Sequence, residues 1–226
     1  KLRPFIFKFD PETAHNLAIH ALKFNLIPSK PRYNFKHLET EVFKKKIPNP
    51  IGLAAGFDKD AEVYNSIFKM GFGFVEVGTI TPLKQFGNPK PRVFRLEEDE
   101  ALINRLGFNN SGADLVQSRI RLNPPKGLFG INIGPNKDSK DRIKDYLIGL
   151  RKFYDLADYL TINISSPNTE NLRSFHNENE LNDLLYAIKK EKVSLKTSVP
   201  TVLKVSPDIN DKEIEKISNL ILKYEI

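Results

Sequence analysis

Five short apolar runs constrain this chain more than any other feature, because each is followed by a polar stretch with helical character. The runs end in Gly, Asn, Ser or Thr, and they begin at Ile51, Phe74, Leu128, Tyr159 and Thr201. Their starts lie 23, 54, 31 and 42 residues apart, which suits strand–helix repeats with one long insertion. Alternation of this kind is typical of a parallel sheet with helices outside it. We therefore predict an α/β fold.

The residues around the predicted strands favour a barrel over a doubly wound sheet. No Gly-x-Gly-x-x-Gly turn follows the first strand, so the dinucleotide-binding fingerprint is missing there. Polar residues instead follow each of the five runs: Asp58 and Lys59, Thr79 and Thr81, Asn132, Asn163 to Asn168, and Lys204. In a (β/α) barrel the carboxyl ends of the strands carry the active site. The prediction is a (β/α)8 TIM-barrel type fold, incomplete at about five βα units.

The N-terminal 25 residues predict a helical extension. Asp10 can cap a helix whose first residue is Pro11. An apolar face is predicted from the spacing of Ala14, Leu17, Ala18, Ala21 and Leu22. The preceding residues are apolar with interspersed basic side chains, so the segment could either pack on the core or lie on a membrane surface. A second helix is predicted from the capping pair Asn210 and Glu213, with Ile214, Ile217 and Ile221 on one face.

Composition narrows the chemistry. The chain has no Cys and four His, at positions 15, 20, 37 and 176, without metal-ligand spacing, so a disulfide, a thiolate nucleophile and a metal centre are not expected. The net charge of +7 comes from scattered Lys residues, which favours a solvated basic surface over a nucleic-acid interface. The strand ends offer Lys and amide side chains but few acids. Such a pocket suits an anionic planar ligand, for example a flavin with a carboxylated heterocycle stacked on it.

Seven motifs then occur in a fixed order. They are Gly52–Asp60, Glu76–Pro82, Gly87–Arg95, Asn104–Asn110, Gly130–Gly134, Asn163–Asn168 and Leu203–Asp208. Together they closely resemble the class 2, quinone-dependent dihydroorotate dehydrogenases, which are FMN enzymes of pyrimidine biosynthesis. The resemblance extends through all 226 residues. It implies oxidation of dihydroorotate to orotate, with FMN as the hydride acceptor and a membrane quinone as the final electron acceptor.

The resemblance also assigns roles to individual residues. FMN would be held by Ala55, Gly56, Phe57, Asp58, Lys59, Thr79, Asn132, Asn163 and Lys204. Dihydroorotate would contact Lys59, Asn104, Arg105, Leu106, Gly107, Phe108, Asn163 and Asn168. Ser166 matches the catalytic base, for which Thr169 and a bound water are predicted as a proton relay. No metal is implied.

A quinone tunnel at the membrane is the third implication of the resemblance. His15 and Arg95 match residues that line it, whereas His20, His37 and His176 are expected at the surface. Residues 1–46 would form the helical quinone-tunnel and membrane-association segment, and residues 47–226 the N-terminal part of the FMN-binding barrel. Peripheral contact is expected through residues 1–25, on the cytoplasmic face of a bacterial inner membrane, with no nucleic-acid partner.

The family pattern continues beyond the fifth βα unit, so we expect a chain that is truncated relative to its family. The missing strands would carry the FMN phosphate site, formed by glycine-rich loops and a helix N-terminus. Two hypotheses remain open at this point. The chain is the N-terminal part of an active dehydrogenase, or it is an inactive truncated remnant without catalysis. A basic nucleic-acid binder is a third idea, but no motif in the sequence supports it.

Overall fold

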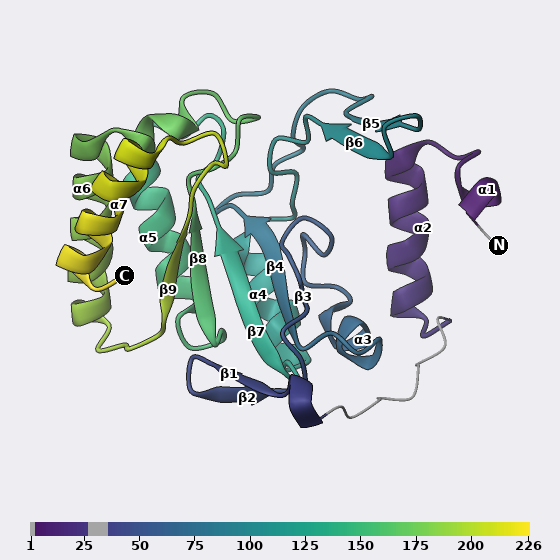
Figure 1. Ribbon diagram of the computed structural model, residues 1–226, viewed down its shortest axis with the longest axis horizontal. Helices are drawn as coiled ribbons and strands as arrows, with labels where there is room; N and C mark the ends of the chain where they lie inside the picture. Colours follow the sequence, from purple (N-terminus) through teal and green to yellow (C-terminus); the bar gives the residue numbers. More distant parts are fainter. Residues whose placement is uncertain (1–2, 27–35) are drawn as a thin grey trace.

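A parallel sheet of five strands forms the centre of the molecule in the computed structural model, which describes residues 3–26 and 36–226 (Figure 1). The strand order is β3-β4-β7-β8-β9. The bounds are Gly52–Leu53 for β3, Phe74–Ile80 for β4, Leu128–Ile133 for β7, Tyr159–Asn163 for β8 and Thr201–Lys204 for β9. Every neighbouring pair is parallel. The five predicted strands and their parallel α/β arrangement are therefore confirmed.

Helices cover one face of this sheet and leave the other face for polar side chains (Figure 1). Along β8, Leu160 and Ile162 are fully buried in the helix-covered core, and Thr161 and Asn163 therefore point to the opposite, inner face. The covering helices are α3 (Tyr64–Lys69), α4 (Ala113–Leu122), α5 (Arg142–Phe153), α6 (Glu178–Ser194) and α7 (Asp211–Tyr224). The predicted long insertion follows β4 and contains the antiparallel hairpin β5 (Val93–Leu96) and β6 (Ala101–Asn104).

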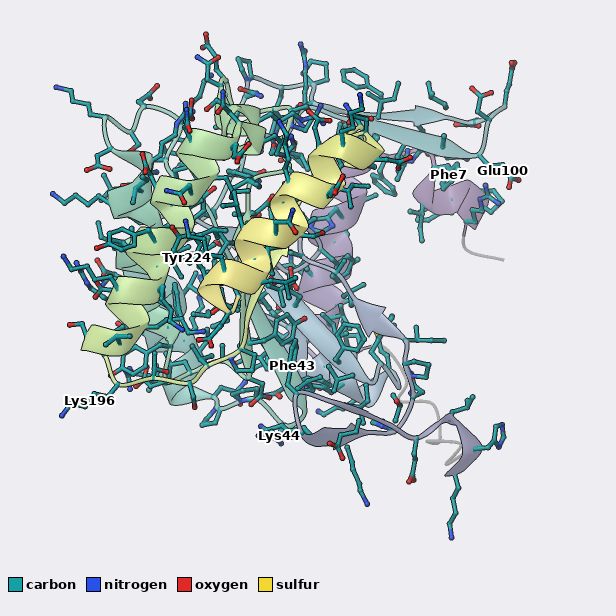
Figure 2. All side chains as sticks on the ribbon, turned by 60° about the vertical axis from the view of Figure 1, so that its left-hand side comes forward. Phe7, Phe43, Lys44, Glu100, Lys196 and Tyr224 are labelled. Carbon is teal, nitrogen blue, oxygen red and sulfur yellow. The ribbon has the colours of Figure 1, made fainter. Side chains whose placement is uncertain are left out.

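A second hairpin lies across the ends where β7 and β8 begin. It consists of β1 (Thr40–Val42) and β2 (Lys45–Ile47), and a short 3-10 helix, η1 (Lys36–Leu38), precedes it. Ile47 packs against the first residues of β7 and β8 in a small core of its own. At the hairpin turn, which Figure 2 labels at Phe43 and Lys44, the Phe43 ring lies 5.2 Å from that of Tyr159. The hairpin thus covers the amino end of the sheet, and the predicted boundary between residues 46 and 47 falls inside β2.

The N-terminal extension consists of α1 (Arg3–Ile6) and α2 (Pro11–Lys23). The predicted cap is confirmed, since Asp10 Oδ1 accepts from the backbone N–H groups of Glu12 and Thr13, each at 3.0 Å. The predicted apolar face is partly wrong. Leu17 is 52% exposed, because α2 packs on α3 and β5 through the side that carries the buried Ile19 and Leu22.

The last helix shows the same mixture of outcomes. The capping box of Asn210 and Glu213 is present in both directions, as predicted. Ile217 is buried, but Ile214 is 46% exposed, so the predicted face is shifted. The shift arises because α7 packs on α6, and the residues it buries there include Tyr224, whose hydroxyl donates to Asn182 Oδ1 at 2.7 Å.

The outer edges of β3 and β9 pair with no further strand among residues 3–26 and 36–226. An unpaired edge invites pairing with another chain. We therefore expect a polypeptide of residues 1–226, prepared alone, to self-associate as its concentration rises, which light scattering would measure. Val202→Lys places a charge on the edge strand β9 and should reduce the association. A wild-type polypeptide that stays monomeric at every concentration would contradict this prediction.

Candidate active site at the carboxyl ends of the strands

Three of the predicted cofactor residues meet at the carboxyl ends of β4, β7 and β8. The Thr79 hydroxyl donates to Asn132 Oδ1 at 2.6 Å and accepts from Asn163 Nδ2 at 2.9 Å. All three side chains are buried. Since they come from three adjacent strands, this contact follows directly from the strand order and register.

Glu76, which the sequence analysis left without a role, lies beneath this group on β4. Its carboxylate accepts from Asn132 Nδ2 at 2.8 Å and from the hydroxyl of Thr161 at 2.9 Å. The sequence contained a signal for it, because Glu76 is an acid between Val75 and Val77 in an apolar run. In the structure both valines are fully buried in the core. An acid within a strand of this kind must find hydrogen-bond partners inside the protein.

The loop that follows β8 is fixed through Asn163. The carbonyl of Asn163 accepts from Tyr146 Oη of α5 at 2.7 Å, and its Oδ1 accepts from Ser165 N at 3.0 Å and Ser165 Oγ at 2.8 Å. Ser166 is half-buried, and its Oγ accepts from Asn168 N at 3.2 Å. That contact uses one lone pair and leaves the hydroxyl hydrogen and the second lone pair for another partner.

Thr169 has a buried hydroxyl that the described residues leave without a hydrogen-bond partner. The side chain itself is 3% exposed and lies three residues after Ser166. A buried hydroxyl normally has a partner, so an orphan one here fits a contact with a bound water or ligand.

The predicted substrate residues come together from the β6 end and the β8 loop. Asn168 Nδ2 lies 3.3 Å from both the carbonyl and the Oδ1 of Asn104. The backbone of Arg105 is held by Asn88 Nδ2 at 2.9 Å. The guanidinium of Arg105 points elsewhere, since it donates to the Pro91 carbonyl at 2.8 and 3.1 Å.

The remaining residues of this loop differ in their positions. Leu106 lines a cavity described below, and Gly107 is buried with a φ of +71°, a backbone conformation that suits glycine. Phe108 is half-buried and packs against the core. Asn104 and Asn168 are therefore the two amide side chains of this group that the fold places together.

The segment from Ala55 to Lys59 follows β3 and is tied to β4. Gly56 N donates to the carbonyl of Gly78 at 2.8 Å, and Gly78 N donates to that of Asp58 at 3.0 Å. The Asp58 carboxylate is buried and accepts from the N–H groups of Glu62 and Val63, at 2.7 and 2.8 Å, and burial raises its pKa. The structure therefore gives the Asp58 side chain a local capping role.

The two predicted lysines differ in environment. Lys59 Nζ donates to the Gly56 carbonyl at 2.5 Å, and burial lowers the pKa of its ammonium group. Lys204 is exposed at the end of β9, where its Cα is paired with that of Asn163. One positive charge is thus enclosed beside the site, and the other stands at its open margin.

A cavity of about 360 Å³ joins α2, the segment after β3 and the β5–β6 hairpin. His15, Phe57, Lys59 and Arg95 all line it, so both predicted quinone residues share one cavity with predicted cofactor residues. The His15 ring contacts Phe57 edge-on with centroids 5.0 Å apart, and burial, followed by the charge of Lys59, lowers the pKa of His15. The rest of the wall is mixed, with apolar side chains, including Ile19, Val93, Leu102 and Leu106, and acidic ones, including Glu12, Asp60 and Glu62.

Arg95 connects this cavity to the N-terminus. Its guanidinium donates to the Phe9 carbonyl at 2.8 Å and lies 4.6 Å from the centre of the Phe7 ring. In Figure 2 Phe7 appears beside the tip of the β5–β6 hairpin, which is labelled at Glu100. The segment between α1 and α2 is therefore anchored on the hairpin inserted after β4.

An ion pair that the sequence analysis did not identify joins α2 to the same insertion. Arg92 is 6% exposed, and its Nε and Nη2 donate to the two carboxylate oxygens of Glu12 at 3.0 and 2.5 Å. The hydrogen bond from Arg92 holds the pKa of Glu12 below its usual value. Arg92 Nη1 also donates to the carbonyls of Phe86 and Asn88, at 2.5 and 3.1 Å.

Arg92→Met should destabilise the protein by about 1–3 kcal/mol, because it removes the bonds of a buried guanidinium and leaves the partly buried Glu12 carboxylate, among the described residues, with Lys90 alone, at 3.6 Å. The double variant Glu12→Gln/Arg92→Met should recover part of this loss. Since the folded pKa of Glu12 is depressed, the stabilisation is present above its unfolded pKa and is lost as the pH falls through its folded pKa. Urea unfolding of the three proteins from neutral to acidic pH would measure both effects. Equal losses in the single and double variants would contradict the prediction.

Two further observations concern the histidines and metals. His176, expected at the surface, is half-buried, because it ends η2 (Leu172–His176), whose Leu172 and Phe175 are buried. Its Nε2 has no hydrogen-bond partner among the described residues. Within the parts of the chain that the structure describes, no group of three His, Cys, Asp or Glu side chains could hold a metal ion.

The parallel strands, the helices on one face and the polar site at the carboxyl ends define a protein of the (β/α)-barrel class. The model of the family described as "Dihydroorotate dehydrogenase" matches residues 37–226. The chain belongs to the dihydroorotate dehydrogenase family, a family of flavoenzymes. The resemblance identified from the seven motifs is thereby confirmed.

The similar proteins are longer than this chain. It is 49% identical over 223 residues to a dihydroorotate dehydrogenase (quinone) of Bartonella tribocorum, covering 97% of this chain and 62% of that protein. Identity to the protein of the same name from Erythrobacter litoralis is 47%, covering 98% and 64%. A crystal structure of the Eimeria tenella enzyme in complex with ferulenol superposes with a TM-score of 0.90 at 37% identity, covering 96% of this chain and 65% of that one. The chain thus spans somewhat less than two thirds of these relatives.

Proposed function

We propose that this protein oxidises dihydroorotate to orotate in pyrimidine biosynthesis, with FMN as the hydride acceptor and a membrane quinone as the final electron acceptor. The observation that carries the proposal is the hydrogen-bonded group of Thr79, Asn132 and Asn163 at the strand ends. It stands next to the loop that holds Ser166, as the family's chemistry requires. The names of the relatives in Bartonella and Erythrobacter support the same activity.

The residues present fit a flavin. Asn132 and Asn163 each have a second amide hydrogen beyond the one used between the strands, and Lys59 and Lys204 supply positive charge. Asn109 adds a buried Oδ1 without a partner among the described residues, on the wall of the cavity. When bound, FMN supplies the capacity to accept a hydride from the substrate and to pass on its electrons. The chain's own part is to hold the cofactor and to neutralise negative charge.

The substrate would be held by amides from two elements. Asn104 at the end of β6 and Asn168 after β8 already contact one another, and they offer both donors and acceptors to a heterocycle that carries a carboxylate. Lys59 provides the complementary charge. This arrangement would fix the orientation of the ring that loses a proton and a hydride.

Ser166 would remove the proton from the ring carbon. A serine hydroxyl is a weak base, so the proton must pass on to another acceptor in a site that excludes water. Thr169 supports this reading, because its buried Oγ1 lacks a partner among the described residues and lies near in sequence. A water bound between the two hydroxyls would complete the relay.

The quinone would enter through the cavity lined by His15 and Arg95. Large apolar side chains are exposed on the first described elements of the chain, among them Phe5 at 60% and Phe24 at 70%. These support a peripheral contact of residues 1–25 with a membrane surface, which we propose to be the cytoplasmic face of a bacterial inner membrane. Among the described residues, no helix combines the length and the apolar character that crossing a bilayer requires.

Anaerobic mixing of the FMN-loaded protein with dihydroorotate tests the proposal. We expect the flavin absorbance to bleach and orotate to form in equal amount, and decylubiquinone to restore the flavin absorbance. A protein that binds FMN but is not bleached by dihydroorotate would contradict the proposed substrate. The alternative of an inactive truncated remnant requires that no orotate forms.

A further inference from the structure

A chain of hydrogen bonds crosses the inner face of the sheet, and each of its bonds is donated in the direction of Glu76. Four side chains form it, and we call them the amide relay: Glu76, Asn132, Thr79 and Asn163. Thr161 lies outside the relay, and among the relay's members its hydroxyl bonds to Glu76 alone. Asn163 donates to Thr79 at 2.9 Å, Thr79 to Asn132 at 2.6 Å, and Asn132 to Glu76 at 2.8 Å. Thr161 donates to the second carboxylate oxygen of Glu76 at 2.9 Å.

The direction of the relay follows from the chemistry of its end. An ionised carboxylate can only accept hydrogen bonds, so Asn132 must turn its Nδ2 toward Glu76 and its Oδ1 toward Thr79. The one hydroxyl hydrogen of Thr79 is then used on Asn132. The oxygen of Thr79 is left to accept from Asn163, whose amide is also oriented by Ser165 N, which donates to its Oδ1 at 3.0 Å.

This orientation decides what the site presents to a ligand. Each amide nitrogen has two hydrogens and uses only one of them within the relay. The second hydrogens of Asn132 and Asn163 therefore remain as donors for acceptor atoms of a bound molecule. If the amide of Asn132 were reversed, it would offer its oxygen, an acceptor, to the same molecule.

We propose that Glu76 is a positioning residue, which orients the amide of Asn132 so that it presents an N–H group, beside that of Asn163, to acceptor atoms of FMN. The proposal rests on the proposed function for the identity of the ligand. Glu76 itself acts through Asn132 and need not contact the cofactor. Val75 and Val77 point into the helix-covered core, so the Glu76 side chain between them points to the opposite, inner face of the sheet.

Three variants separate this role from simple packing. Glu76→Met keeps a similar volume but removes the acceptor from Asn132. Glu76→Gln retains one acceptor oxygen for Asn132, and its NH₂ group can donate to the Thr161 hydroxyl, so the relay keeps its direction. Thr161→Val is the matched control, because it removes the other arm of Glu76 at a side chain that is 2% exposed and leaves the relay intact.

Titration of each apoprotein with FMN, followed by quenching of the flavin fluorescence, gives the first readout. We expect Glu76→Met to raise the dissociation constant about tenfold or more, because a misoriented amide leaves buried groups unsatisfied. Glu76→Gln and Thr161→Val should stay within about threefold of wild type. The second readout is hydrogen exchange of the ¹⁵N-labelled Asn side-chain amides without FMN, which should quicken for Asn132 in Glu76→Met alone, because Asn163 keeps its bonds to Thr79 and Ser165.

The outcomes distinguish the two proposals. Unchanged FMN affinity and unchanged amide exchange in Glu76→Met would overturn the positioning role, as would an equal loss in Thr161→Val. A wild-type protein that does not bind FMN would contradict the proposed function, while the exchange measurement would still decide whether Glu76 orients the amide of Asn132.

Discussion

Replacing Ser166 by alanine should slow the bleaching of the flavin by dihydroorotate by about two to four orders of magnitude, the range that a general base contributes. The substitution removes the only side-chain oxygen at this position while the backbone contacts of the loop remain. Asn168 loses one hydrogen bond at 3.2 Å, from its backbone N–H to Ser166 Oγ. Binding of dihydroorotate should therefore change little, because the amides of Asn104 and Asn168 are still in place. Stopped-flow absorbance under anaerobic conditions measures the rate and the affinity separately.

Ser165→Ala provides the matched control for this experiment. Ser165 Oγ donates to Asn163 Oδ1 at 2.8 Å, but the backbone N–H of Ser165 donates to the same atom at 3.0 Å and is retained. The control variant should therefore weaken binding modestly and leave the limiting rate within a few-fold of wild type. If Ser166→Ala also kept a rate within a few-fold of wild type, Ser166 would be excluded as the base.

Removal of residues 1–25 should abolish reduction of decylubiquinone and leave bleaching by dihydroorotate largely intact. The deletion takes away α2, and with it the cavity wall formed by Pro11, Glu12, His15, Asn16 and Ile19. The site at the strand ends draws none of its hydrogen bonds from residues 3–25, the part of this segment that the structure describes. The deletion should be combined with Arg92→Met, because the buried guanidinium would otherwise lose its carboxylate partner.

A point variant on the same helix controls for general damage to α2. Leu17 is 52% exposed and does not line the cavity, so Leu17→Ala should reduce decylubiquinone at the wild-type rate. Both variants are assayed in detergent solution, so that a difference in membrane binding does not affect their rates of quinone reduction. Undiminished quinone turnover after the deletion would show that residues 1–25 do not form the quinone site.

Sequence alone predicted the parts of this structure that depend on local pattern. The five strands follow from their apolar runs, and the contact among Thr79, Asn132 and Asn163 follows from parallel strands whose carboxyl ends meet at one edge. The Asp10 cap and the Asn210 capping box were readable because a cap depends on residues three positions apart.

The features that were missed depend on distant parts of the chain. Leu17 and Ile214 fit the helical spacing, but which face of an amphipathic helix is buried depends on its neighbours in space. Glu76 accepts hydrogen bonds from Asn132 and Thr161, which are 56 and 85 residues away from it in sequence. No periodicity connects positions so far apart, so these pairs became visible only through the register of β4, β7 and β8.

The ion pair between Glu12 and Arg92 has a consequence for the order in which the molecule is assembled during synthesis. The two residues are 80 positions apart, so Arg92 leaves the ribosome about 4–16 s after Glu12 at the usual 5–20 residues per second. For that interval α2 has neither its charge partner nor the hairpin that completes the cavity wall. The helix made early thus waits for residues 92–96 before it can complete its native contacts, and the exposed Phe and Leu side chains of the N-terminal segment are available to a chaperone or a bilayer before the barrel is formed.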